Sequence, residues 1–102
     1  MTPDHSHGAD VLEALRAPAK DLRSAIPDVY AGFSATNKAA LDPGVIDAAM
    51  KEIIALAIAV AQQCDGCIAS HARGAAMKGA TPEQVAEMLG VAILMTGGPA
   101  TV

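Results

Sequence analysis

Residues 51–71 read KEIIALAIAVAQQCDGCIASH, an almost wholly apolar run bracketed by an acid, two thiols and an imidazole. Cys64, Cys67 and His71 follow one another at spacings of three and four residues, so all three project from one face of a helix that begins near Cys64. A thiol becomes a good nucleophile only when it loses its proton, and a helix N-terminus or a neighbouring imidazole favours that loss. The stretch therefore predicts a thiol pair with a base attached. Cys67, one turn from His71, is expected to be the more acidic thiol, and Cys64, at the helix edge, the more accessible one.

Glu52 is the acid of this stretch, and its role depends on where the chain turns. The apolar residues cover all sides of the segment, which predicts a central, buried helix over residues 45–62. A turn over residues 63–66 would fold the next helix back antiparallel and bring Glu52 within about a helical turn of His71. From spacing alone, Glu52 is equally well a solvated surface residue or a functional base held in the interior.

Turn and capping residues divide the rest of the chain into helices. Asp42-Pro43-Gly44 breaks the first half, Asp65-Gly66 supplies the turn at the thiols, and Thr81-Pro82-Glu83-Gln84 starts the last helix with a capping box. Pro18 is expected to open a new helical segment. The predicted helices cover residues 10–16, 18–25, 27–41, 45–62, 64–77 and 82–96, and no stretch shows convincing strand alternation.

Length and composition predict a single globular domain, since the chain has 102 residues and 52% of them are hydrophobic. We predict an all-α fold, a compact helical bundle over residues 10–102 whose antiparallel helix pair carries the C-x-x-C motif. Residues 1–9 are expected to form a flexible leader, in which His5 and His7 are more simply solvated than metal-binding. The apolar residues exceed what so small a domain can bury, which predicts a homo-oligomer.

Charge and hydropathy exclude several classes of partner. The net charge of −4 has no basic cluster beside it, so no nucleic-acid partner is expected. The longest apolar run, residues 53–61, is far shorter than the ~20 residues that span a bilayer, so no membrane partner is expected. The first ten residues lack the pattern of a secretion signal, and a cytoplasmic location follows. In that reducing compartment a C-x-x-C pair is more often redox-active or metal-binding than structural.

The order of Glu52, eleven residues, Cys64, two residues, Cys67, three residues and His71 resembles the signature of the alkylhydroperoxidase D-like branch of the carboxymuconolactone decarboxylase family. The alanine-rich sequence after the histidine and the final Gly-Gly-Pro extend the resemblance over residues 27–99. It implies an all-helical subunit assembled as a trimer or hexamer, which reduces a peroxide and receives electrons from a dithiol partner such as a lipoyl-bearing protein. It also implies that Cys67 is the attacking thiolate, His71 and Glu52 its proton relay, and Cys64 the resolving thiol.

One departure and three alternatives accompany this interpretation. Some members of the branch carry a histidine directly before the second cysteine, where this chain has Gly66, so a weak peroxidase activity is expected. The leading hypothesis is an antioxidant thiol peroxidase or related disulfide oxidoreductase that needs no cofactor. The alternatives are a zinc site made of Cys64, Cys67, His71 and Glu52, a non-catalytic assembly module with inert thiols, and a lactone decarboxylase-type enzyme. The last of these is disfavoured because, by the same resemblance, the lactone decarboxylases do not depend on the cysteine pair.

Overall fold

The computed structural model describes residues 8–97, which form five helices and no strand. The predicted all-α class is therefore confirmed for this part of the chain. The expected leader, with His5 and His7, falls almost wholly on residues 1–7, which lie outside the described residues. The helices are α1 (Ala9–Ala25), α2 (Pro27–Leu41), α3 (Ala48–Ala61), α4 (Asp65–Met77) and α5 (Pro82–Thr96).

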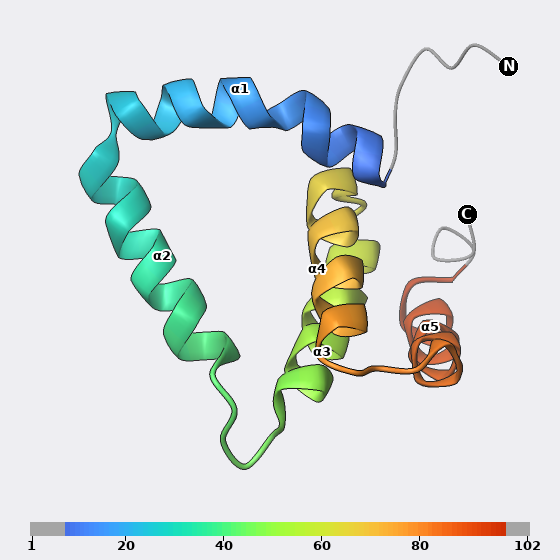
Figure 1. The fold of residues 1–102 in the computed structure, drawn as a ribbon. Coiled ribbons are helices and arrows are strands. Elements are labelled where there is room, and N and C mark those ends of the chain that lie inside the picture. Colours follow the sequence, from blue (N-terminus) through green and yellow to red (C-terminus); the bar gives the residue numbers. More distant parts are fainter. Residues whose placement is uncertain (1–7, 98–102) are drawn as a thin grey trace, which may run out of the picture.

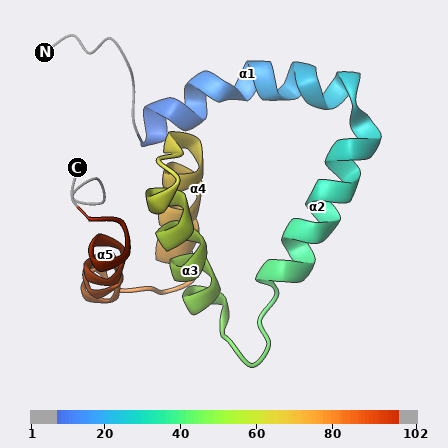
Figure 2. The ribbon, with the colours of Figure 1, turned by 180° about the vertical axis from the view of Figure 1, so that it is seen from behind.

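The centre of the fold is the antiparallel pair of α3 and α4, as predicted (Figure 1). Helices α1 and α2 form two sides of an open triangle that this pair closes, and α5 packs on α3 outside the triangle; Figure 2 shows the same arrangement from behind. The radius of gyration is 14.9 Å, where a compact domain of this length has about 13 Å. The subunit is thus more open than the compact bundle predicted. Within residues 8–97, the buried apolar side chains all belong to α3, α4 and α5, and they are Ile53, Leu56, Ala59, Ala69, Ala75 and Ala92.

Two helix boundaries differ from those predicted. Helix α1 continues through Pro18, although a proline inside a helix removes one backbone hydrogen bond and costs about 3 kcal/mol. Ala14, whose carbonyl loses that bond, is exposed, so water can replace the missing donor. Helix α3 begins at Ala48, three residues later than expected, because the Asp47 side chain caps it by accepting the Met50 N–H at 2.8 Å.

The turn between α3 and α4 is made by Gln63, the first residue of the turn predicted over residues 63–66. Gln63 adopts φ 55°, in the left-handed region. Its N–H donates to the Val60 carbonyl at 3.1 Å, and the Cys64 N–H donates to the Ala59 carbonyl at 3.1 Å. This pair of bonds is a Schellman closure, which usually has glycine in the left-handed position. The break predicted at Asp65-Gly66 is therefore wrong, because both residues already belong to the first turn of α4.

Helix α4 ends and α5 begins as the sequence predicts. Gly79, with φ 92°, closes α4 by a second Schellman motif. The Gln84 N–H donates to the Thr81 hydroxyl at 3.1 Å, and the Thr81 N–H donates to the Gln84 side chain at 2.9 Å. These two bonds confirm the predicted capping box.

The apolar run of α3 is only partly covered within one subunit. Ile53 and Leu56 are buried, whereas Ile54 and Ile58 are 42% and 54% exposed. The prediction that this helix is buried on all sides is thus wrong for the single chain. Helices α1 and α2 extend away from α3 and leave part of its apolar surface uncovered. Within residues 8–97, no helix has the length and apolar character needed to cross a bilayer.

Candidate active site

Cys64 and Cys67 are joined by a disulfide at the N-terminus of α4, with their Cα atoms 5.2 Å apart. Cys64 is the N-cap residue of the helix, and its sulfur accepts the Cys67 N–H at 3.3 Å. The structure therefore shows the oxidised state of the pair. A C-x-x-C motif in a helical first turn brings the two sulfurs together without any movement of other elements.

The exposure of the two cysteines is the reverse of that predicted. Cys67 is exposed and Cys64 is half-buried. Cys64 is less accessible because its backbone closes α3 through the bond to the Ala59 carbonyl while also capping α4, which places it between the two helices. Cys67 is the third residue of α4, and it is exposed to solvent and therefore open to a reactant.

Glu52 points inward and bonds to His71, so this carboxylate is not a solvated surface residue. Glu52 is only 8% exposed, and its Oε2 lies 2.8 Å from Nδ1 of His71. In the neutral tautomer that this contact favours, Nδ1–H donates to the carboxylate. The second ring nitrogen, Nε2, then carries the lone pair that can accept a proton. A buried carboxylate that orients a histidine in this way also stabilises the imidazolium that forms when the ring takes up a proton.

The structure thus assembles the predicted site residues as two adjacent pairs. Cys64 bonds to Cys67, and Glu52 bonds to His71. No hydrogen bond in the described chain joins His71 to either sulfur, but Cys67 and His71 are four residues apart on α4 and therefore lie one turn apart on the same face. The imidazole is about a quarter exposed, with 24% side-chain accessibility, so proton exchange with solvent is open to it.

The four side chains are not arranged as a zinc site in this state. Across residues 8–97 no three His, Cys, Asp or Glu side chains form a group suited to a metal ion. Two of the candidate donors are disulfide sulfurs, which are not thiolate ligands, and the other two are hydrogen-bonded to each other.

Gly66, which stands where some related proteins have a histidine, lies against α1. A Cβ placed on Gly66 would come 3.2 Å from Cδ1 of Leu15, closer than ordinary van der Waals contact. The tip of the Leu15 side chain on α1 would therefore have to shift by a few tenths of an ångström to admit a side chain at position 66. This contact could not be predicted from local sequence signals, because Leu15 and Gly66 are far apart along the chain.

Gly74 is a residue of this site that sequence reasoning missed. It faces the Glu52 carboxylate directly, since a Cβ on Gly74 would lie 2.5 Å from Glu52 Oε2. One signal could have found it, because Glu52 and Gly74 both lie eleven residues from Gln63. In an antiparallel pair that turns at Gln63, equal distances from the turn place two residues side by side.

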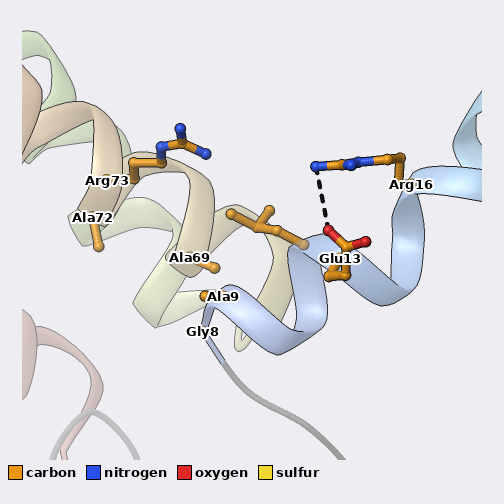
Figure 3. A pocket seen from close by; sticks show the side chains of 8 residues that line it. Gly8, Ala9, Glu13, Arg16, Ala69, Ala72 and Arg73 are labelled. Carbon is orange, nitrogen blue, oxygen red and sulfur yellow. Dashed lines mark ion pairs between the residues drawn. The ribbon is translucent and has the colours of Figure 1, made fainter.

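A cavity of about 510 Å³ between the start of α1 and α4 lies outside this site. Figure 3 shows it bordered by Ala69, Ala72 and Arg73 of α4 and by residues 8–16 of α1, including the Glu13–Arg16 ion pair of 3.2 Å. Ala69 and Arg73 each follow a site residue by two positions, so they project from the other side of α4. The cavity contains none of the four site residues.

Comparison with known proteins agrees with the fold and the thiol motif. Residues 27–102 match the carboxymuconolactone decarboxylase family. The chain belongs to this family. The predicted resemblance, over residues 27–99, is thereby confirmed at the level of the family. Within it, the C-x-x-C pair and the Glu52–His71 contact agree with the alkylhydroperoxidase D-like signature.

Several proteins are similar to this chain over much of their length. An uncharacterized protein of Cupriavidus necator is 44% identical over 78 residues, which cover 76% of this chain and 69% of that protein. A protein of the cox locus of Paracoccus denitrificans is 41% identical over 67% of this chain and 61% of its own length. A carboxymuconolactone decarboxylase family protein from Legionella pneumophila, solved in its apo form, has 38% identity and a TM-score of 0.84 over 87% of this chain and 80% of its own. A crystal structure from Thermotoga maritima gives 27% identity and a TM-score of 0.78 over 88% and 79% of the two chains.

Proposed function

We propose that this member of the carboxymuconolactone decarboxylase family is a thiol-dependent hydroperoxide reductase, or a disulfide oxidoreductase of the same type. The observation that carries the proposal is the pairing of a C-x-x-C disulfide with a buried Glu52–His71 couple one turn further along the same helix. A thiol that can form a disulfide with its neighbour and that has a base within reach meets the needs of peroxide reduction. An antioxidant role in the cytoplasm agrees with this chemistry.

The proposed cycle begins with the reduced protein. The Cys67 thiolate attacks one oxygen of the peroxide ROOH, so that an S–O bond forms, the O–O bond breaks and the alcohol ROH leaves with a proton. The Cys64 thiol then attacks the sulfenic acid of Cys67, which forms the disulfide and releases water. A dithiol partner, for which we propose a lipoyl-bearing protein, reduces the disulfide by thiol–disulfide exchange and becomes a disulfide itself.

Each site residue has a distinct task in this cycle. Cys67 is the exposed thiol that meets the peroxide, and Cys64 is the half-buried thiol that resolves the sulfenic acid. His71 accepts the Cys67 proton at Nε2 and supplies it to the leaving alcohol oxygen. Glu52 holds the ring in the productive tautomer through the 2.8 Å contact at Nδ1.

A thiol titration of metal-free, pre-reduced protein tests the proposal. One equivalent of tert-butyl hydroperoxide is expected to remove both cysteine thiols of each chain, and dihydrolipoamide is expected to restore them. Thiols that stay titratable after peroxide would identify an assembly module with inert cysteines. Thiols that are protected by added zinc and unaffected by peroxide would identify a metal site.

We also propose that the subunit forms a homo-oligomer, a trimer or hexamer. Large apolar side chains on separate helices are open to solvent, including Phe33 on α2 at 68% and Leu94 on α5 at 79%. Exposed apolar side chains on different helices support more than one contact per subunit.

A further inference from the structure

The backbone of α4 makes room for the Glu52 carboxylate at one residue. A Cβ built on Gly74 would lie 2.5 Å from Oε2, 2.7 Å from Cδ and 3.0 Å from Oε1 of Glu52. Real Cβ atoms are not found within 3.0 Å of other heavy atoms. By contrast, a Cβ on Gly32 of α2 or on Gly90 of α5 would meet nothing within 4 Å. The carboxylate therefore occupies the volume that any other residue at position 74 would fill.

Glycine is an unfavourable residue for the interior of a helix, since it loses more backbone entropy than alanine on folding. Gly74 lies in the last turn of α4 (Asp65–Met77), where its backbone is still helical, and it has no left-handed φ that would require a glycine. Its presence therefore needs another reason, and the close approach of the carboxylate provides one.

We infer that Gly74 is a positioning residue, which sets the Glu52 carboxylate against Nδ1 of His71 and thereby fixes the tautomer of the base. The inference deepens the proposed peroxide reductase function and rests on it for its catalytic consequence. Gly74 touches neither sulfur nor, in the proposed cycle, the peroxide. It acts through Glu52, whose carboxylate lies against the α4 backbone at Gly74 and 2.8 Å from Nδ1 of His71.

The substitution Gly74→Ala separates this role from a role in folding. The atoms that a new methyl group would meet belong to the end of a flexible glutamate side chain, so the carboxylate moves away more easily than the helices do. Alanine also favours the helix. We therefore expect Gly74→Ala to remain folded, with Glu52 displaced from His71.

The decisive measurement is the tautomer of His71, read by nitrogen-15 NMR of the ring and assigned by comparison with His71→Gln. The wild-type ring is expected to carry its proton on Nδ1, and Gly74→Ala is expected to give a mixture of the two tautomers. In the same variant, peroxide-driven disulfide formation should slow by about tenfold, as expected for loss of an oriented base. Gly90→Ala, whose methyl group enters open space, is the matched control and should change neither property.

A second pair of variants keeps the test decisive if Gly74→Ala proves unstable. In a Glu52→Ala background the carboxylate is absent, so adding Gly74→Ala should raise the melting temperature. In the wild-type background, where the carboxylate is present, Gly74→Ala should raise the melting temperature by less, or lower it. Equal shifts in both backgrounds would overturn the inference, because the two sites would then be independent. An unchanged His71 tautomer in folded Gly74→Ala would overturn it as well.

The two proposals can fail separately. A protein that does not react with peroxide, but whose His71 tautomer changes on Gly74→Ala, would refute the reductase function and support the positioning role. A protein that reacts with peroxide equally well with glycine or alanine at position 74, with the same tautomer, would refute the positioning role alone.

Discussion

Replacing Glu52 by glutamine should slow peroxide-driven disulfide formation by about tenfold. The carboxylate is 8% exposed and bonds to Nδ1 of His71 at 2.8 Å. A hydrogen bond to a charged group contributes about 1.5–3 kcal/mol and a neutral one about 0.5–1.5 kcal/mol. Glutamine can keep a neutral bond, so the substitution removes about 1–1.5 kcal/mol from the stabilisation of the imidazolium. Since about 1.4 kcal/mol is a factor of ten in rate, the reaction slows by roughly that factor.

The assay is stopped-flow loss of thiols in pre-reduced protein mixed with hydroperoxide, repeated across a range of pH. We expect Glu52→Gln to slow the reaction at pH 7 by about tenfold and His71→Gln to slow it by about the same factor or more, and we expect both to move the pH–rate profile to higher pH. The double variant should be little worse than either single one, because the two groups act as a unit. Glu87→Gln, on the exposed face of α5, is the matched control and should behave as the wild type. Multiplicative losses in the double variant, or an unchanged Glu52→Gln profile, would show that the carboxylate is not coupled to the thiols.

Three further predictions concern the thiols, the assembly and the turns. Peroxide should give a trappable sulfenic acid on Cys67 in a Cys64→Ser variant and none in a Cys67→Ser variant; the opposite pattern would reverse the roles of the two thiols. Light scattering of dilute protein should give at least a trimer, and a uniform monomer at micromolar concentration would refute the proposed assembly. Gln63→Gly should raise the free energy of unfolding by about 0.5–1 kcal/mol, since glycine adopts the left-handed conformation without the steric strain that a glutamine has there. Gly79→Ala, at φ 92°, should lower it by about 1–2 kcal/mol in the same chemical denaturation assay, and opposite signs would contradict the assigned turns.

Local signals in the sequence were enough for the all-helical class and for several boundaries. The capping box of Thr81 and Gln84 and the closing Gly79 were predicted correctly because each depends on residues within a few positions of one another. The same signals failed at Pro18 and at the start of α3. A proline is compatible with either the first turn or the exposed interior of a helix, and Val45 extends an apolar pattern that Asp47 in fact interrupts by capping α3.

Only part of the site geometry could be predicted from the sequence. The spacing of Cys64, Cys67 and His71 predicted one helix face, and the disulfide and the position of His71 on α4 agree with it. The exposure of the two thiols was predicted in reverse, because accessibility depends on how α3 ends against α4. Nothing in the local sequence stated that Gln63 would take a left-handed conformation without a glycine.

The sequence by itself determined the helices and the helix face that carries the thiols and the imidazole, because capping and periodicity are properties of neighbouring residues. Only the tertiary structure decided that Glu52 points inward, that it meets His71 rather than solvent, and that Gly74 leaves the space for it. The physical reason is that a carboxylate tolerates either environment. Whether Glu52 is buried depends on the partner that the antiparallel pairing of α3 and α4 brings within hydrogen-bonding distance. That pairing is fixed by the turn at Gln63 and not by Glu52 itself.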